Sequence, residues 1–288
     1  MSLKSNYFYV MFRKNAAMKL PNNTGLLSEF KLIKNPAFHW CADPFPITIN
    51  DKQYIFAEIM SRITGKASIG YVCLNDKKIR WKKCFKPKFH ISFPNIYSDG
   101  KAVYAMPETY QDHCLAKYSV STQDFSWKKE EVILSLSYCV DSCFDKDGKT
   151  ILLTYENNGH CSKSPNTLVI RNFSNPSEIL FSVVDKGNLL RPAGNCFMME
   201  GSLILPSQDC TSIYGGGIIF NKLDLKNQRI ERLDSSIYPS DIKANSEYSK
   251  AAGCHTYNCC DDLEVIDVLL PKFSIRGLLH KIKKVAGR

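Results

Sequence analysis

The sequence predicts an all-β fold, a five-bladed β-propeller followed by a short basic amphipathic helix. Short alternating runs rich in Ile, Val, Tyr and Phe dominate the chain before residue 272, and turn signals separate them. A hairpin pattern recurs five times, with successive copies starting 47 to 64 residues apart, about the length of a four-stranded blade. The 288 residues are 44% hydrophobic, which is enough for a large core.

Each copy of the hairpin pattern consists of an apolar strand, a polar turn and a second apolar strand that ends near a polar residue. The copies run from Asp43 to Glu58, from Pro94 to Glu108, from Asp141 to Glu156, from Arg191 to Asp209, and from His255 to Val268. Their predicted turns lie at Asn50-Asp51, Asp99-Gly100, Asp147-Gly148, Glu200-Gly201 and Asp261-Asp262. The strand YFYVMFRK, residues 7–14, is expected to complete the last blade and close the ring, which removes open sheet edges.

The ends of these hairpins predict a pocket. In an antiparallel hairpin, the start of the first strand and the end of the second lie at the same end. If each hairpin is the inner part of a blade, all five ends meet at one mouth of the central channel. The residues expected there are Asp43, Glu58, Glu108, Asp141, Arg191, Gln208, Asp209 and His255. The alternative is that each polar residue merely ends a strand at the surface.

The final segment differs from the rest of the chain. It holds six basic residues and no acidic residue, so the remainder carries about +4 of the net charge of +10. Its apolar residues recur at helical spacing. We therefore divide the chain into a propeller catalytic domain, residues 1–271, and a basic amphipathic helix, residues 272–288. The helix is expected either to lie on an anionic membrane surface or to pack against the body with its charges solvated.

Composition and cysteine spacing indicate where in the cell the protein is expected to act and which partners it is expected to bind. No apolar run reaches signal-peptide length or the roughly 18 residues of a membrane span. The twelve cysteines form no C-x-x-C pair, which favours reduced, buried thiols. Cys259-Cys260 lies near His255 but lacks a second ligand pair at zinc spacing, so no metal or other cofactor is expected. We expect a cytoplasmic protein, peripheral at the inner face of the plasma membrane, that binds no nucleic acid.

Several motifs occur in a fixed order and carry a family resemblance. They are ADPF…IFAE, FHISFPNIYSDGKAVYAMPE, RPAGN, SQD…YGGG and GCHTYN. Over roughly residues 30–270, this order resembles the N-terminal propeller domain of plant glucosamine inositolphosphorylceramide transferases, which has bacterial relatives in surface-polysaccharide pathways. That domain is in turn similar to the five-bladed fold of glycoside hydrolase family 43. The resemblance implies that Asp43 is a general base and that Asp141 orients the substrate and tunes a pKa.

The sequence departs from those hydrolases at the general acid. The resemblance places a Glu on blade four, whereas Glu200 falls in the hairpin turn, at the end away from the pocket. Glycoside hydrolysis normally needs two carboxyl groups. Transfer from a phosphate-activated donor instead needs positive charge and hydrogen-bond donors for the leaving phosphate, and Arg191, His90 and His255 are suited to supply them. Asp43 would then deprotonate the acceptor hydroxyl, which favours inversion.

The predicted function is therefore glycosyl transfer in the synthesis of a bacterial surface polysaccharide, an O-antigen or a capsule. The donor would be a nucleotide sugar or phosphoribosyl diphosphate, and the acceptor a glycan or a lipid-linked glycan. Two alternatives stay open, a family 43-type glycoside hydrolase and a non-catalytic carbohydrate-binding propeller.

Several site residues have a second interpretation. Glu108 is assigned to catalysis with Asp43 and Asp141, but it can equally pair with a neighbouring lysine. His90 is either a substrate contact or a core histidine. Tyr214 is expected to stack on a sugar ring, although the glycines after it can equally serve a tight turn. Asp209 is the substitute acid if the protein is a hydrolase.

Overall fold

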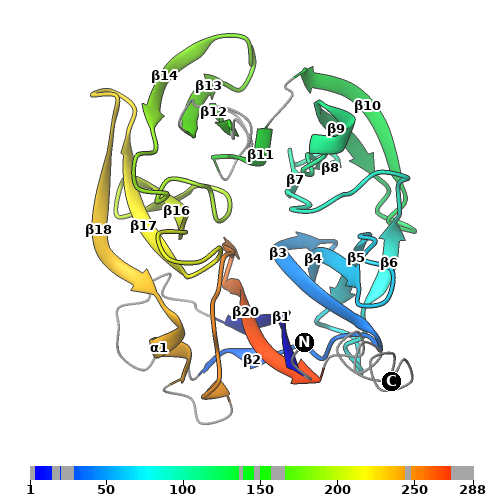
Figure 1. Ribbon diagram of the computed structural model, residues 1–288. Helices are drawn as coiled ribbons and strands as arrows, with labels where there is room; N and C mark the ends of the chain where they lie inside the picture. Colours follow the sequence, from blue (N-terminus) through cyan, green and yellow to red (C-terminus); the bar gives the residue numbers. More distant parts are fainter. Residues whose placement is uncertain are drawn as a thin grey trace, which may run out of the picture.

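The computed structural model describes residues 4–14, 20, 29–135, 139–145, 150–156, 166–243 and 248–273. Within them, five four-stranded sheets are arranged around a common centre (Figure 1), which confirms the predicted five-bladed propeller. Residues 272 and 273 of the predicted basic helix end the last strand, and residues 274–288 lie outside the described residues.

The five blades follow one another along the chain, and each is an antiparallel sheet. Blade one contains β3 (His39–Ile49), β4 (Lys52–Ser61), β5 (Ile69–Cys73) and β6 (Lys82–Phe85). Blade two contains β7 (Ile96–Ser98), β8 (Val103–Ala105), β9 (Leu115–Val120) and β10 (Trp127–Leu134). Blade three contains β11 (Cys139–Phe144), β12 (Ile151–Glu156), β13 (Thr167–Asn172) and β14 (Ile179–Val184). Blade four contains β15 (Phe197–Met199), β16 (Ser202–Asp209), β17 (Gly217–Asp224) and β18 (Arg229–Ile237). Blade five contains β19 (Tyr257–Cys260), β20 (Leu263–Phe273), β1 (Lys4–Lys14) and β2 (Lys31–Leu32).

Burial falls from the inner strands to the outer strands. Strand β12 is buried over most of its length, and β4 is buried along its central part, because both are packed on both faces there. Strands β10 and β18 are mostly exposed or half-buried. Helices are few and short in the described part of the chain. They include the 3-10 helix η2 (Tyr110–Asp112) and the α-helix α1 (Pro239–Lys243). No helix in the described part of the chain is long and apolar enough to cross a membrane.

The hairpin turns lie where the sequence predicts them. Asn50 and Asp51 have φ values of 48° and 59°, as the tight turns between twisted strands require. Gly100 has a φ of 87°, and Glu200 and Gly201 have 48° and 73°. These turns lie at the end of each hairpin that faces away from the site described below. The predicted turn at Asp147-Gly148 lies outside the described residues.

The first strand of the chain closes the ring, as predicted for residues 7–14. Strand β1 pairs with β20 along its whole length, from Lys4 opposite Phe273 to Lys14 opposite Leu263. A buried ion pair supports this seam, because Arg13 Nε lies 2.5 Å from Glu264 Oε2. β2 pairs with the other edge of β1 and completes the blade.

Asparagine side chains near the centre join one blade to another. Asn95 Nδ2 donates to Ser142 O at 2.8 Å, and Asn258 Nδ2 donates to Pro44 O at 2.9 Å. Asn195 donates its side-chain amide to Asn95 Oδ1 at 2.8 Å and its backbone N–H to Asn258 Oδ1 at 2.9 Å. These bonds satisfy polar groups buried where the blades meet.

Eleven cysteines in the described part of the chain are free, and six of these are buried. Cys143 and Cys196, on blades three and four, are fully buried in the main hydrophobic cluster.

Candidate functional site

The inner hairpins bring their polar ends together around one cavity of about 210 Å³, which we call the carboxylate cavity. It is lined by Phe8, Trp40, Asp43, Glu58, Met60, His90, Ser92, Glu108, Asp141, Arg191, Tyr214 and His255. Eight of the ten site residues expected from the sequence are in this set. The other two, Gln208 and Asp209, are described below.

Two aspartates enter the cavity from equivalent bulges. Asp43 in β3 and Asp141 in β11 have φ values of 52° and 47°, and in each strand the pairing register shifts around the aspartate. A bulge of this kind bends the strand and re-aims one side chain. Left-handed backbone at a non-glycine residue is uncommon, and Asp tolerates it better than most residues. The local conformation thus explains why both blades carry Asp at this point.

Asp43 is held by three elements. Its Oδ1 accepts a hydrogen bond from Thr256 Oγ1 at 2.9 Å, and its Oδ2 accepts one from Phe93 N at 3.2 Å. Its own N–H donates to Asp267 Oδ2 at 3.1 Å. Burial raises the pKa of Asp43 to about 6, against the opposing charge of His255. At neutral pH Asp43 is therefore a carboxylate that can accept a proton.

His255 lies between two carboxylates. Its Nδ1 is 2.6 Å from Asp267 Oδ2, and its Nε2 is 3.5 Å from Asp43 Oδ1. The imidazole stacks on Phe8 with 4.2 Å between ring centroids. Burial alone would lower the pKa of His255, but the charges of Asp267 and Asp43 raise it to about 9. The ring is thus an imidazolium at neutral pH.

Glu58 and Glu108 occupy equivalent places on blades one and two. Glu58 pairs with Ala42, just before the bulge in β3, and Glu108 pairs with Ser92, just before the left-handed Phe93. Burial raises the pKa of both carboxyl groups well above the usual range, and neighbouring carboxylates raise it further. Both carboxyl groups therefore keep their proton to a higher pH than an ordinary glutamate, and in the protonated form they can donate a hydrogen bond as well as accept one.

The two glutamates differ in their partners. Glu108 Oε2 accepts a hydrogen bond from Asp141 N at 3.2 Å. Glu58 Oε1 is buried, and His90 Nε2 lies 3.9 Å from it. No hydrogen-bond partner for this oxygen is found among the described residues. Burial lowers the pKa of His90, so its ring is mainly neutral.

Arg191 enters the cavity already paired. Its Nε lies 2.5 Å from Asp141 Oδ2, and Gln208 Nε2 donates to the same oxygen at 3.0 Å. The guanidinium also lies over the ring of Tyr214, 5.1 Å from its centroid. Gln208 therefore acts on Asp141 from behind the cavity surface. The charge of Arg191 is largely offset by Asp141, so less of it is available to the phosphate that Arg191, His90 and His255 were expected to bind.

Tyr214 and Asp209 have different positions. Tyr214 is 53% exposed and lines the cavity, edge-on to His255 with 5.3 Å between centroids. The glycine after it serves the tight turn, because Gly215 has a φ of 64° and a Cβ there would lie 3.0 Å from that of His255. Asp209 lies outside the cavity lining, where Tyr238 Oη donates to it at 2.7 Å and Thr211 Oγ1 at 2.6 Å.

Asp209 is therefore a poor substitute acid. Burial would raise its pKa, but the bonds from Thr211 and Tyr238 outweigh burial and lower it. The described carboxyl groups with raised pKa that line the cavity are those of blades one and two instead.

Sequence reasoning missed several members of the site. Asp267 is fully buried and fixes His255, and its signal was an acid inside the apolar run LEVIDVLL. Phe8 was expected in the closing strand but not at the cavity. Trp40 and Met60 line the cavity beside blade five, and nothing in their local sequence marks them as site residues.

Asp43, His255 and Asp267 also have the donor atoms for a cation. One ligand atom from each lies within 4.8 Å of the others, and all three residues are buried. The two carboxylates, however, already flank the imidazolium of His255, and a divalent cation would have to displace its proton. The described geometry thus favours the protonated histidine as the cation of this cluster.

Comparison with known protein families gives a match over most of the chain. The family model described as "Glucosamine inositolphosphorylceramide transferase 1, N-terminal" matches residues 13–246. Glucosamine inositolphosphorylceramide transferase 1 of Arabidopsis thaliana is 28% identical over 215 residues, 70% of this chain and 26% of that protein. The protein of the same name from Oryza sativa subsp. indica is 26% identical over 196 residues, 65% of this chain and 26% of that protein. The chain spans about a quarter of the length of these relatives.

Solved structures share the fold. An exo-β-1,3-galactanase from Phanerochaete chrysosporium superposes with a TM-score of 0.52 at 9% identity, over 93% of this chain and 66% of that one. A β-fructofuranosidase of glycoside hydrolase family 32 from Bombyx mori gives 0.52 at 13% identity, over 80% of this chain and 55% of that one. At such identities the likeness concerns the fold alone, and function has to be argued from the site.

Proposed function

Because the chain belongs to the family defined by the N-terminal region of glucosamine inositolphosphorylceramide transferase 1, we propose that it is a glycosyltransferase. It would move a sugar from a phosphate-activated donor to a glycan acceptor. The curated relatives are about four times as long as the matched region. The activity of this chain is therefore argued from its own cavity.

The observation that carries the proposal is the state of Asp43. It is buried, lines the cavity, and has a pKa raised to about 6. A base with a pKa just below the working pH is ionised and still accepts a proton readily. In the proposed step, the acceptor hydroxyl oxygen bonds to the anomeric carbon and its proton passes to Asp43. The bond from that carbon to the donor phosphate breaks, and the phosphate leaves with the electron pair, so the configuration inverts.

The rest of the cavity is suited to holding a sugar. Protonated Glu58 and Glu108 can donate to sugar hydroxyls, while Asp141 accepts from them. Trp40 and Tyr214 offer aromatic surfaces at the rim, the usual partners of a sugar ring's apolar face. Arg191 orients Asp141, since its Nε lies 2.5 Å from the carboxylate.

The proposal includes a cellular setting. The acceptor would be a glycan or lipid-linked glycan of a bacterial surface polysaccharide, an O-antigen or a capsule, assembled at the inner face of the plasma membrane. The basic segment 274–288 would hold the protein on anionic lipid there. A lipid-linked acceptor stays in the membrane, and this favours an enzyme that stays at the membrane surface.

A ligand screen tests the proposal. A ligand that binds the folded state raises the melting temperature. We expect nucleotide sugars or phosphoribosyl diphosphate to raise it and neutral oligosaccharides to raise it less. Incubation with the stabilising donor and a glycan acceptor should then consume the donor. Stabilisation by neutral oligosaccharides alone would contradict the transferase.

Glycoside hydrolysis is the second candidate, and the raised pKa of the two glutamates favours it. The sequence suggested that the general acid is lost, yet Glu58 and Glu108 supply two carboxyl groups with raised pKa beside the Asp43 carboxylate. A protonated carboxyl group opposite a carboxylate is what glycoside hydrolysis requires. Release of free sugar from oligosaccharides without an activated donor, lost in both Asp43→Asn and Glu108→Gln, would establish this function instead.

A further inference from the structure

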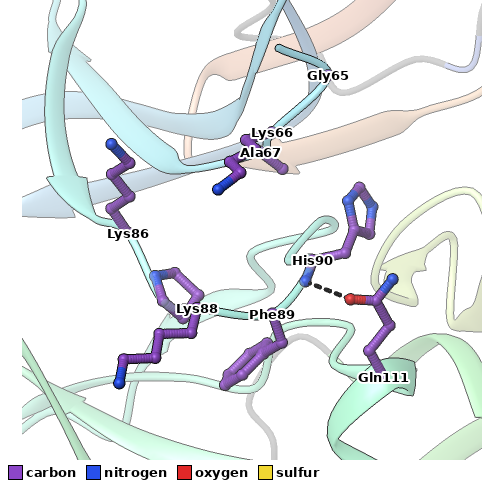
Figure 2. Close-up of a pocket in the computed structure, with 9 residues that line it drawn as sticks. Gly65, Lys66, Ala67, Lys86, Lys88, Phe89, His90 and Gln111 are labelled. Carbon is purple, nitrogen blue, oxygen red and sulfur yellow. Dashed lines mark hydrogen bonds between the residues drawn. The ribbon is translucent and has the colours of Figure 1, made fainter.

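A second pocket adjoins the carboxylate cavity and has the opposite charge. It has a volume of about 260 Å³ and lies between blades one and two, with His90 in the walls of both spaces. We call it the lysine pocket; its walls include Lys66, Lys86, Lys88, Phe89, His90 and Gln111. In Figure 2, Lys86 and Lys88 lie on one side, His90 and Gln111 on the other, and Lys66 at the top between them.

The three lysines come from two segments at the same end of the propeller as the carboxylate cavity. Lys66 lies in the turn between β4 and β5, and Lys86 and Lys88 lie in the connection from β6 to β7. None of the three is joined to a carboxylate among the residues that the structure describes. After burial, the charge of Lys86 is the largest cause that lowers the pKa of neighbouring Lys83. Positive charge is thus in excess here.

Hydrogen bonds fix the walls that present these lysines. In the turn, Gly65 N donates to Ser61 O at 2.9 Å, and Thr64 N donates to Ser61 Oγ at 3.1 Å. On the opposite wall, His90 N donates to Gln111 Oε1 at 2.8 Å (Figure 2). The backbone of the pocket is therefore ordered before a ligand arrives, which lowers the entropy cost of binding.

The carboxylate cavity cannot hold a phosphate-activated sugar alone. Its volume of about 210 Å³ is below the about 300–1,000 Å³ of sites that enclose a small-molecule ligand. Its cations are also committed, since Arg191 is paired with Asp141 and His255 with Asp267. A diphosphate brings about two negative charges and would meet the carboxylates of Asp43 and Asp141 there.

We infer that the lysine pocket binds the diphosphate group of the substrate while the adjoining carboxylate cavity binds the sugar. This inference rests on the proposed function, and it adds a phosphate-binding subsite made of Lys66, Lys86 and Lys88. His90 lies at the boundary, beside the bond that breaks. The diphosphate ester can belong to the soluble donor or to a lipid-linked acceptor, and we assign it to the donor because the leaving phosphate must adjoin the sugar.

Direct binding of inorganic pyrophosphate tests the pocket. The full chain is titrated with pyrophosphate by calorimetry, as wild type and with Lys66→Gln, Lys86→Gln and Lys88→Gln combined. All three side chains are exposed, so the fold should persist, and circular dichroism checks it. We expect affinity to fall about tenfold or more in this triple variant, and binding to wild type to weaken with added salt.

A matched triple variant controls for general charge. Lys52, Lys101 and Lys226 are exposed in or directly beside hairpin turns at the opposite end of their blades. Replacing all three with Gln removes the same charge and should change pyrophosphate affinity less than about twofold. Equal losses in the two triple variants, or loss in Arg191→Ala with none in the pocket variant, would overturn the inference.

Two further experiments are needed. One distinguishes the donor from a lipid-linked acceptor as the source of the diphosphate, and the other distinguishes failure of the phosphate subsite from failure of the proposed function. Displacement of pyrophosphate by a nucleotide sugar or phosphoribosyl diphosphate supports the donor. Displacement only by a lipid-linked diphosphate in micelles overturns the donor assignment. Pyrophosphate binding at the lysines without turnover of any donor contradicts the proposed function and leaves the anion subsite standing. Turnover of a donor with an unchanged KM in the variant that lacks Lys66, Lys86 and Lys88 supports the proposed function and contradicts the phosphate subsite.

Discussion

Asp43 and Asp267 meet across the seam between blades one and five, where the Asp43 N–H donates to Asp267 Oδ2 at 3.1 Å and both carboxylates lie against His255. The two acids are 224 residues apart in the chain. They differ in proton affinity because Asp267 is closest to the imidazolium. The pKa of Asp43 is raised to about 6, whereas the charge and hydrogen bonds of His255 outweigh burial and lower that of Asp267. One acid can therefore take up a proton near neutral pH while the other holds the histidine.

Replacement of Asp43 by Asn removes the proposed base. We expect kcat to fall by about 10²–10⁴ while donor affinity changes little, because the amide cannot accept a proton. Steady-state kinetics with the donor found in the ligand screen measure both. Asp99→Asn, in the exposed turn of blade two, is the control and should have no effect. Full activity of Asp43→Asn would remove Asp43 from the chemistry.

Activity should depend on pH through the same residue. Asp43 works as a base only when ionised, so kcat should rise as the pH increases through about 6 and then level off. The profile is measured from pH 5 to 8 with a saturating donor. A rate that is flat across pH 6 would show that the ionisation of Asp43 does not limit the reaction.

The free energy of unfolding should fall as the pH rises from about 6.5 to about 9, because His255 loses its proton more readily in the unfolded chain. Its folded-state pKa of about 9 is above the usual 6.5, so its contribution is present below 6.5 and is lost as the pH rises toward 9. Between pH 7 and 8 this amounts to about 1 kcal/mol of unfolding free energy per pH unit. Urea unfolding of wild type and His255→Gln at both pH values isolates the effect. An equal slope in the variant would contradict the assignment.

Glu58 is predicted to tolerate an amide. Burial raises the pKa of Glu58 well above its usual range, which favours the protonated form, and Gln has nearly the same shape. Glu58→Gln should therefore change the unfolding free energy at pH 7 by less than about 0.5 kcal/mol. A loss of several times this amount would indicate that the buried carboxylate is ionised and paired. Glu264→Gln is the comparison, because Glu264 is ion-paired with Arg13 and should be clearly destabilised.

Arg191 and Asp141 should behave as a coupled pair. Arg191→Ala leaves the Asp141 carboxylate buried without its cation, and we expect a loss of about 2–4 kcal/mol in unfolding free energy. The cost is below that of a fully enclosed pair because 19% of the Arg191 side chain is exposed. Adding Asp141→Asn should recover part of the loss. Additive effects of the two substitutions would contradict the coupling.

The C-terminal segment carries a prediction of its own. Deleting residues 274–288 should release the protein from vesicles that contain anionic lipid and leave the melting temperature unchanged. Sedimentation with anionic and with neutral vesicles measures the binding. Vesicle binding that survives the deletion would exclude this segment as the membrane contact. The cut follows Phe273 because that residue pairs with Lys4 in the closing blade.

The sequence predicts the fold and much of the cavity because both depend on local patterns. The period of the hairpins predicts the blades, and antiparallel geometry places Glu58 beside Asp43 without any knowledge of tertiary contacts. Contacts between side chains of different blades leave no such pattern in the local sequence. Nothing near Arg191 indicates that Asp141, 50 residues earlier, will hold its charge. The lysine pocket was missed for the same reason, since it joins a turn in blade one to the connection into blade two.

The closing strand has a consequence for how the protein is made. Phe8 is synthesised before the residues of blade one, yet its ring stacks on His255, and β1 has no sheet partner on one edge until β20 exists. Blades one to four can form as the chain emerges, whereas blade five and the cavity must wait for residues near 270. Contacts that span so much of the chain form slowly. A nascent chain would thus be expected to acquire its substrate-binding ability in one late step, after β20 has been synthesised.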